Sequence, residues 1–494
     1  MESPPVSPAL DRASAQVRLS QGLTPWLVLG SVASVSLALT GVSVGSVPRV
    51  GAGFSWLGLP RSGSSVLTLL FYVALCLMVT AWLGVGREAR LGNLTVTRAC
   101  LVLAAWGLPL FLGPPLFSRD LYSYIAQGLV AHHGLNPYTT GPVALGNGPL
   151  LRSVALVWRA TPAPYGPLFV AASRGLAALF GSALVAEVLA MRVLELVGVA
   201  LMVYSLPRLA RMLGADPGIA LWLGVLSPLA LYSFISSGHN DALMLGLLLT
   251  GITVSLERRP MLGLVLCALA TMVKTPAAAG IVFLAANQLS GVRGSKRWAV
   301  LAKAVLVPAA TVVIVTMASG LGWQWLSPSA LRIPTELRIL ATPTVSIGVL
   351  VFHVLHLVGI PVHQHACVTV TQLVCGVAGV AGVAWLIANV RKLDVVRAIG
   401  IALIVVVLVG PTLWPWYFTW GLALLAATPA QRSKTLALAA ALAMFIVGPS
   451  GTPLIGGIDY IFVALASFAA GQWLLRNRRW MKVIGPRRPV PLTS

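Results

Sequence analysis

Long apolar stretches alternate with short polar breaks along almost the whole chain. A helix of about 20 apolar residues crosses the hydrocarbon core of a bilayer, and Gly or Pro inside such a helix is tolerated. Read by hydropathy and length, the pattern predicts an all-α membrane protein with about fourteen transmembrane helices. They are expected near residues 26–46, 65–86, 99–118, 185–207, 218–237, 240–256, 261–273, 276–290, 298–319, 366–390, 397–413, 415–430, 435–450 and 455–474.

Two further apolar stretches are expected to lie along the membrane interface or to re-enter it, rather than to cross. Residues 167–180 carry Arg174 in mid-segment, and residues 344–362 carry His353 and His356. Polar and charged side chains are costly in the middle of a span but ordinary in an interfacial helix. We therefore predict interfacial helices in the outer loops.

Composition supports this class and suggests one large domain. Hydrophobic residues make up 57% of the 494 residues, charged residues 9%, and the mean hydropathy is +0.89. These values are typical of a polytopic membrane protein. We expect a cytoplasmic leader over residues 1–25, a single multi-span domain over 26–475 and a basic cytoplasmic tail over 476–494.

The placement of the basic residues predicts the orientation of the chain. The net charge is +22, and about two thirds of the 34 Lys and Arg residues fall in segments that the predicted spans place on one side. Loops rich in Lys and Arg stay in the cytoplasm. We therefore predict a multi-pass plasma-membrane protein whose large loop 119–184 faces outward. A nucleic-acid partner is not expected, because the basic residues form no soluble basic domain.

Asp120 is the first candidate for chemistry. It follows an apolar span that ends near Phe117, in a chain with only 12 acidic residues. A carboxylate here would act as a general base on a sugar hydroxyl; alternatively, it only caps a helix or pairs with Arg119. The loop after it carries aromatic and amide side chains that suit sugar or acceptor binding: Tyr122, Tyr124, Gln127, Asn136 and Tyr138.

A second polar break, Gly-His-Asn-Asp at residues 238–241, opens another predicted helix. Asn240 and Asp241 are both good N-cap residues, which is the simpler interpretation. Alternatively, a helix N-terminus that carries His239 attracts a phosphate, with Asn240 and Asp241 facing the sugar or acceptor. One histidine and one aspartate are too few to indicate a metal site.

Lys274 lies between two short apolar halves, residues 261–273 and 276–287, where Pro276 interrupts the helix. An ammonium group in such a break requires an anionic partner. It would bind a phosphate as a point charge, unless the side chain simply extends to the membrane surface.

Aromatic residues beside prolines form two further candidate contacts. Tyr165 precedes Gly166 and Pro167, and Trp416 and Tyr417 follow Pro415. Such residues are sugar-stacking candidates, although aromatic belts at membrane interfaces explain them equally well. His353, His356, His363 and His365 lack carboxylate partners, so no metal site and no cofactor are predicted, and a divalent metal is left open.

The sequence contains no GxxxxGK[ST] motif, and its predicted cytoplasmic loops are too short for a nucleotide-sugar domain. An enzyme built in this way must draw its activated substrate from the membrane.

Together these features resemble the GT-C glycosyltransferases. More closely, they resemble the actinobacterial polyprenol-phosphate-mannose-dependent α-(1→6)-mannosyltransferases of lipomannan and lipoarabinomannan synthesis. The motifs that carry the resemblance are RDLYSY at 119–124, AQG at 126–128, GLNPY at 134–138, PYGPL at 164–168, GHND at 238–241, Lys274 and PWY at 415–417.

The resemblance implies a GT-C fold and transfer of mannose, with inversion, from polyprenyl-phosphate-mannose to a phosphatidylinositol-mannoside or lipomannan acceptor in α-1,6 linkage. It implies Asp120 as the catalytic base, with His239, Lys274 and Arg119 around the leaving lipid phosphate. One difference from the family concerns Leu121, which follows Asp120 where many GT-C enzymes have a second acidic residue. That difference puts a metal requirement in question.

Two alternatives stay open on the sequence alone. One is a transferase that uses another polyprenyl-phosphate sugar, such as an arabinosyl donor. The other is a secondary transporter or flippase for lipid-linked sugars, with Lys274 in a broken helix as its binding site.

Overall fold

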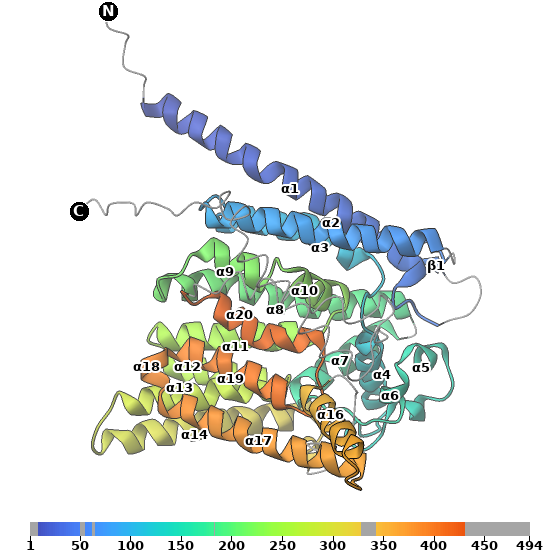
Figure 1. Cartoon of the computed structure of the whole chain (residues 1–494), viewed down its shortest axis with the longest axis vertical. Helices are drawn as coiled ribbons and strands as arrows, with labels where there is room; N and C mark the ends of the chain where they lie inside the picture. Colours follow the sequence, from blue (N-terminus) through green and yellow to red (C-terminus); the bar gives the residue numbers. More distant parts are fainter. Residues whose placement is uncertain (1–7, 50–54, 62–64, 182, 328–341, 430–494) are drawn as a thin grey trace, which may run out of the picture.

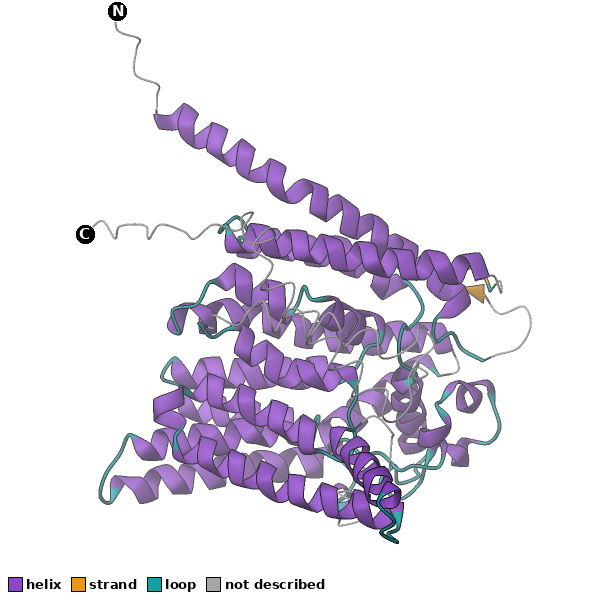
Figure 2. Cartoon of the chain, in the orientation of Figure 1, coloured by secondary structure: helices purple, strands orange, loops and turns teal. Residues whose placement is uncertain are grey.

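The computed structural model describes residues 8–49, 55–61, 65–181, 183–327 and 342–429. These residues are mostly helical, as Figure 2 shows. The strands among them are β1 (Ser55–Trp56) and β2 (Leu59–Pro60), which pair as one short antiparallel hairpin. The predicted helical class is therefore confirmed for the described part of the chain.

The helices that make up the body of the molecule run roughly side by side (Figure 1). They are α1 (Pro8–Val44), α2 (Ser65–Arg90), α3 (Val96–Leu112), α8 (Leu184–Met212), α11 (Asp241–Leu256), α12 (Pro260–Thr271), α13 (Ala278–Ser290), α14 (Lys296–Ser319), α16 (Pro343–Leu357), α17 (Gln364–Ala388), α19 (Val395–Val409) and α20 (Phe418–Ala426).

The helices between α3 and α8 gather at one end of this body, on the right in Figure 1. They are α4 (Asp120–His132), η1 (Pro142–Leu145), α5 (Pro149–Ser153), α6 (Leu156–Arg159) and α7 (Pro167–Phe180). The remaining short elements are α9 (Pro217–Gly224), α10 (Pro228–Ala230), η2 (Leu231–Ser236), η3 (Thr275–Ala277), η4 (Gln324–Leu326), α18 (Val390–Leu393) and η5 (Pro415–Tyr417).

Several helices have the length and apolar character of membrane spans. Within the described residues, four qualify alone: Gly22–Val44, Ser65–Arg90, Lys296–Ser319 and Gln364–Ala388. A fifth results if α9 and the segment Pro228–Ser236, which meet at a bend of 49°, are counted as one span. The total of fourteen stays a prediction, and the spans expected at 435–450 and 455–474 lie outside the described residues.

The apolar surfaces of these helices fit a lipid environment. In the most apolar window of α17 only 11% of the residues are buried within the protein, and in that of α14 only 17%. Such a surface would be unstable in water but is ordinary against acyl chains. The chain is therefore a helical membrane protein.

The predicted helix break at Lys274 and the two helices predicted at 167–180 and 344–362 are confirmed. Lys274 has an extended backbone (φ −153°, ψ 128°) and separates α12 from η3 and α13. The stretch 167–180 forms the 14-residue helix α7. Pro167 is its first residue, a position whose backbone N–H has no partner within the helix, so proline is tolerated there. The helix at 344–362 is α16, which ends earlier, at Leu357. Whether α7 and α16 lie in the interface stays a prediction.

The arrangement brings polar ends of several helices to one place. α4 packs on α7, and α11 packs between α8 and α12. The N-terminus of α11, the break after α12 and the η5–α20 turn thereby lie near the start of α4. These four segments form the candidate site.

Candidate active site

A tight turn delivers Asp120 to the start of α4. Pro114 and Pro115 follow the end of α3 and keep the chain from continuing as a helix. Phe117 has a φ of 64°, an unusual conformation for a bulky residue and one that tends to occur at functional sites. Ser118 Oγ then accepts a hydrogen bond from the Asp120 backbone N–H at 3.1 Å.

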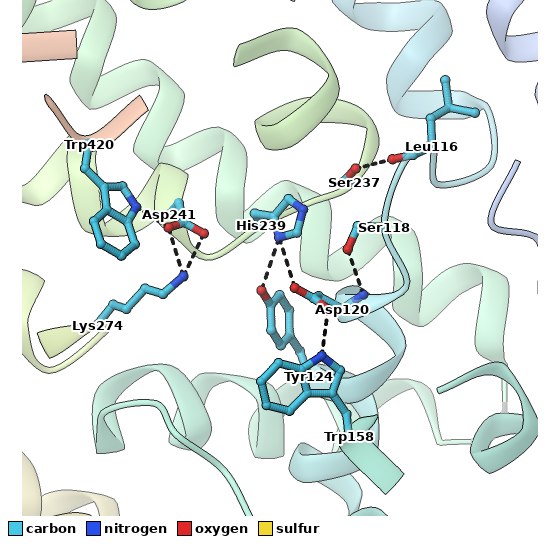
Figure 3. Close-up of polar contacts among 10 residues, drawn as sticks. All are labelled: Leu116, Ser118, Asp120, Tyr124, Trp158, Ser237, His239, Asp241, Lys274 and Trp420. Carbon is cyan, nitrogen blue, oxygen red and sulfur yellow. Dashed lines mark hydrogen bonds and ion pairs between the residues drawn. The ribbon is translucent and has the colours of Figure 1, made fainter. Parts of the chain in front are cut away.

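The Asp120 carboxylate is buried between an indole and an imidazole (Figure 3). Trp158 Nε1, from α6, donates a hydrogen bond to Oδ1 at 3.0 Å. His239 Nδ1, from the turn before α11, lies 3.6 Å from Oδ2. Three segments distant in the sequence therefore meet at this one carboxylate.

The surroundings of Asp120 bring the pKa of its carboxyl close to physiological pH. Burial raises the pKa of the Asp120 carboxyl to about 6; the charge of Lys274 lowers it, and that of Asp241 raises it. The hydrogen bonds from Trp158 and Ser118 act in the lowering direction because they favour the ionised form. A general base works best with a pKa near the operating pH.

His239 is held in place by stacking and by backbone geometry. Gly238 has a φ of 61°, which only glycine adopts without strain, and its backbone turns the chain into α11. The imidazole stacks on Trp416 with ring centroids 4.1 Å apart. Its Nδ1 also lies 3.4 Å from the Tyr124 hydroxyl.

The imidazole is neutral in this setting. Burial lowers the pKa of His239 well below its usual range, and the positive charge of Lys274 lowers it further. His239 Nε2 is buried without a hydrogen-bond partner among the described residues. The ring can therefore offer a hydrogen bond to a ligand, but it is a poor source of positive charge.

Asp241 and Lys274 form a buried ion pair. Lys274 Nζ donates to both Asp241 oxygens, each at 2.9 Å. Trp420 Nε1, from α20, donates to the same carboxylate. Asn240 occupies the N-cap position of α11, as the simpler interpretation predicts, but its side chain makes no capping hydrogen bond.

Aromatic rings surround the Lys274 ammonium group. Nζ lies 4.7 Å from the ring centroid of Tyr417, 5.3 Å from that of Trp420 and 6.0 Å from that of Tyr165. These distances allow cation–π attraction. The predicted aromatic turns therefore converge on the predicted cation.

The Tyr165 turn packs directly on the break that holds Lys274. The Gly166 N–H donates to the Val273 carbonyl at 3.2 Å. A Cβ at position 166 would lie 2.0 Å from the Met272 carbonyl oxygen, so any larger residue would push the two segments apart. Glycine is required here by close backbone approach.

A cavity of about 160 Å³ opens beside this cluster. Its lining is mostly apolar and aromatic. Among the described residues that line it, Lys274 carries the charged side chain. It is lined by Trp158, Pro164, Tyr165, Lys274, Thr275, Pro276, Val406, Val407, Gly410, Pro411, Thr412, Trp414, Tyr417 and Trp420. Trp158, which binds Asp120, forms one wall, so the cavity contacts Lys274 and the hydrogen-bond partner of the carboxylate, although Asp120 itself does not line it.

Arg192, a buried residue of α8, forms hydrogen bonds to both of the loops that carry the site. Its guanidinium donates to the carbonyls of Phe111, Gly113 (2.7 Å) and Ser236. The first two carbonyls lie at the end of α3, before Asp120, and the third lies before His239. Ser237 Oγ donates to the Leu116 carbonyl and joins the same two loops.

The other sugar-binding candidates in α4 and its loop are placed differently from one another. The Tyr124 hydroxyl faces His239, and Gln127 is buried without a hydrogen-bond partner among the described residues. Tyr122 donates to the Ser46 carbonyl at 2.7 Å. Asn136 Oδ1 accepts from the Tyr138 N–H at 2.9 Å and shapes its own loop. None of these five residues lines the cavity beside Lys274.

Arg119 is adjacent to Asp120 in sequence but has other partners. Its Nη1 donates to the Val47 carbonyl at 3.3 Å and to the Ser153 carbonyl at 3.2 Å. Among the described residues it forms no ion pair with Asp120. The structure thus groups Asp120, His239, Asp241 and Lys274 with Tyr165, Trp416 and Tyr417, and it places Arg119 in a separate environment.

Trp158, Trp420 and Arg192 belong to the site but were not predicted from the sequence. Trp158 lies six residues before Pro164, and Trp420 lies three residues after Tyr417, one helical turn further along. These two tryptophans could have been identified in the sequence only by their closeness to the predicted motifs. Arg192 carries its own signal, because a charged residue inside a predicted span requires polar partners.

The histidines at 353, 356, 363 and 365 do not form a metal centre in the described part of the chain. Among those residues, the structure contains no group of three or more His, Cys, Asp or Glu side chains that could hold a metal ion. The acidic groups of the site contact nitrogen donors of other side chains: Trp158 donates to Asp120, and Lys274 donates to Asp241. The site therefore offers proton transfer, hydrogen bonding and one cation.

Comparison with known proteins assigns the chain to a family. Residues 27–290 match the family model described as alpha-(1->6)-mannopyranosyltransferase, N-terminal domain, and residues 343–476 match the MptB C-terminal domain. The chain belongs to the alpha-(1->6)-mannopyranosyltransferase family. The resemblance inferred from the sequence motifs is therefore confirmed.

Curated members of this mannosyltransferase family are similar over most of the chain. Alpha-(1->6)-mannopyranosyltransferase A of Mycobacterium tuberculosis is 32% identical over 92% of this chain and 92% of its own length. Alpha-(1->6)-mannopyranosyltransferase B of Corynebacterium glutamicum is 28% identical over 92% of this chain and 82% of its own length. A probable alpha-(1->6)-mannopyranosyltransferase of Mycolicibacterium smegmatis is 32% identical over 94% of this chain and 89% of its own length.

The site draws on both segments that match the mannosyltransferase models. Asp120, His239 and Lys274 lie within 27–290, whereas Trp416 and Trp420 lie within 343–476. Trp416 stacks on His239 and Trp420 binds Asp241, so the contacts across the two segments complete the site.

Proposed function

We propose that this chain is an inverting glycosyltransferase that moves mannose from polyprenyl-phosphate-mannose to a mannan acceptor, in α-1,6 linkage. The observation that carries the proposal is the buried Asp120 carboxylate, which is hydrogen-bonded by Trp158 and flanked by His239, together with a cavity that both Trp158 and Lys274 line. A single positioned carboxylate next to a cation suits direct displacement of a lipid phosphate. Membership of a mannosyltransferase family supports mannose as the sugar.

Asp120 would act as the general base. In the ionised form, its carboxylate takes the proton from the attacking acceptor hydroxyl as the acceptor oxygen bonds to C1 of mannose. The bond between C1 and the phosphate oxygen breaks at the same time, on the opposite face of the sugar, and the bonding electrons leave with the phosphate. The product is inverted at C1, and one proton has moved from the acceptor to Asp120.

Lys274 would stabilise the leaving phosphate. Its ammonium group already lies in a buried, aromatic environment, where its attraction to an anion is screened less than in water. Asp241 fixes the position of Nζ, and so prepares the cation before the donor arrives. The neutral His239 would add no charge; in the tautomer with the proton on Nε2, that N–H would donate to the phosphate while Nδ1 accepts from the Tyr124 hydroxyl.

Arg119 is the weakest of the three predicted phosphate ligands. Its guanidinium donates to backbone carbonyls of Val47 and Ser153, so we leave it outside the donor site. Asp120 and Asp241 approach each other closely enough to interact electrostatically. Many GT-C enzymes have a second acidic residue beside the catalytic one, where this chain has Leu121. Here the second carboxylate is that of Asp241, at the start of α11, and Lys274 neutralises it.

The wider setting follows from the same proposal. We infer a GT-C architecture with about fourteen spans, with the site on the outer face and a lipid donor that reaches the cavity from the membrane. A phosphatidylinositol-mannoside or lipomannan would be the acceptor in the synthesis of the lipomannan and lipoarabinomannan core. Membership of a transferase family argues against the transporter alternative.

Product analysis tests the proposal. The purified chain is supplied with radiolabelled polyprenyl-phosphate-mannose and a short α-1,6-mannoside, and the product linkage is determined by methylation analysis. We expect 6-substituted mannose carrying the label. Transfer from a polyprenyl-phosphate-arabinose donor with no transfer from the mannose donor would support the alternative sugar, and no transfer from either would contradict the proposal.

A further inference from the structure

Five arginines gather close to the ends of α1, α2 and α3, and none of them lines the donor cavity. The predicted orientation leaves all of them on the outer side, where basic residues are otherwise few. They are Arg49, Arg61, Arg119, Arg152 and Arg159.

Hydrogen bonds to backbone carbonyls link four of these residues, and the fifth, Arg61, is near enough for its charge to act on Arg119. Arg119 bonds the carbonyls of Val47 and Ser153. Arg152 Nε donates to the Arg49 carbonyl at 3.4 Å, and Arg159 Nη2 donates to the Arg152 carbonyl at 2.9 Å. The arrangement is therefore a built cluster of cations rather than a scatter of surface side chains.

The cluster lacks negative partners in the described part of the chain. The ion pairs found there join Arg87 to Glu88, Arg208 to Glu257 and Lys274 to Asp241, and Asp120 lies beside the neutral His239. Burial lowers the pKa of Arg119 to about 10, and the neighbouring charges of Arg49, Arg61 and Arg159 also lower it. Mutual repulsion of this kind is relieved when an anion binds.

The candidate spans place the cluster at the depth of lipid headgroups. Arg49 follows the end of the candidate span Gly22–Val44 by five residues, and Arg61 precedes the candidate span Ser65–Arg90 by four. A span ends where the hydrocarbon core ends, so residues this close to it lie among the headgroups.

Exposed leucines accompany the arginines. Leu57, at the tip of the β1–β2 hairpin, is 54% exposed and has a φ of 49°, a costly conformation for a leucine. Leu156, at the start of α6, is 76% exposed. The hairpin is anchored by Trp56, which is buried and donates to the Leu112 carbonyl at 2.8 Å. Basic residues beside exposed apolar ones are typical of a surface that contacts anionic membranes.

We propose that the cluster of Arg49, Arg61, Arg119, Arg152 and Arg159 binds the phosphate headgroup of an anionic phospholipid in the adjacent leaflet. None of these five arginines lines the cavity beside Lys274, so this site is distinct from the proposed donor site. It would hold loop 119–184 at a fixed depth against the membrane. The inference does not depend on the identity of the transferred sugar.

Lipid retention tests the proposal. The full-length chain in a neutral detergent is mixed with equal amounts of phosphatidylglycerol and phosphatidylcholine and passed over a sizing column, and the lipids that co-elute are quantified. The test variant is Arg49→Gln/Arg61→Gln, because both side chains are exposed and have no side-chain hydrogen bond to lose among the described residues. The controls are Arg49→Lys/Arg61→Lys, which keeps the charge, and Arg211→Gln on the opposite predicted side.

The wild type should retain phosphatidylglycerol in preference to phosphatidylcholine. Each arginine near an anionic lipid surface contributes about fivefold, which corresponds to about 1 kcal/mol, so the double Gln variant should reduce the preference by roughly 25-fold. Both controls should behave as the wild type. An unchanged preference in the Gln variant would overturn the proposal. Displacement of the lipid by inorganic phosphate alone would also overturn it, because the site would then bind free anions.

Discussion

Lys274 Nζ lies 2.9 Å from each carboxylate oxygen of Asp241, and this ion pair is buried at a break between two helices. In a buried pair the loss of one partner leaves an uncompensated charge, so folding and function both depend on the two residues. The pair therefore offers a way to separate the structural role of Lys274 from its role toward the donor phosphate.

We expect Lys274→Met and Asp241→Asn each to destabilise the protein by about 3–5 kcal/mol. The double variant Lys274→Met/Asp241→Asn should recover much of that stability, because no unpaired charge remains. It should nevertheless transfer mannose poorly and show a raised KM for the donor. Thermal unfolding in detergent and steady-state transfer measure the two effects. Full transfer activity in the double variant would mean that Lys274 is only structural.

The pH dependence of transfer should report the ionisation of Asp120. Because its pKa is raised to about 6, the carboxyl is protonated and inactive as a base below that pH, and kcat/KM should rise through pH 6 to a plateau. Trp158→Phe removes the hydrogen bond that favours the ionised form, so the rise should shift to higher pH. Trp298→Phe, an exposed position, is the control. An identical profile in Trp158→Phe would rule out this role for the indole.

Gly166 should be intolerant of even a methyl group. Because a Cβ there would lie 2.0 Å from the Met272 carbonyl oxygen, Gly166→Ala should displace the break that carries Lys274 and cost about 1–3 kcal/mol of stability. Gly148→Ala is a matched control, because a Cβ at that position would meet no atom within 4 Å. The two variants are compared by thermal unfolding and donor KM. Equal behaviour would show that the close approach at Gly166 is not needed.

Local features of the sequence predict the helices and their breaks well. Hydropathy identifies the long apolar helices, and Pro276 beside Lys274 correctly predicts the interruption between α12 and α13. Pro167 likewise predicts the start of α7. These successes share a cause, because proline and apolar length act on the backbone within a few residues.

Pairings between distant segments are harder to predict. Asp241 and Lys274 are each predicted from their own motif, and nothing local indicates that they bind each other or that Trp420, 179 residues after Asp241, joins them. Likewise, Arg119 is adjacent to Asp120 but bonds residues 47 and 153. Such partners depend on helix packing, which single-residue patterns do not encode.

The most direct test of the proposed mechanism is transfer by Asp120→Asn. Purified variant and wild type are given labelled polyprenyl-phosphate-mannose and a mannoside acceptor, and initial rates are compared at saturating donor. The amide keeps the size and the hydrogen bond from Trp158 but cannot take a proton, so the rate should fall by roughly 100- to 10,000-fold. Asp216→Asn, at the N-cap of α9 and remote from the site, should retain wild-type activity. Wild-type transfer by Asp120→Asn would contradict the role of Asp120 as the base.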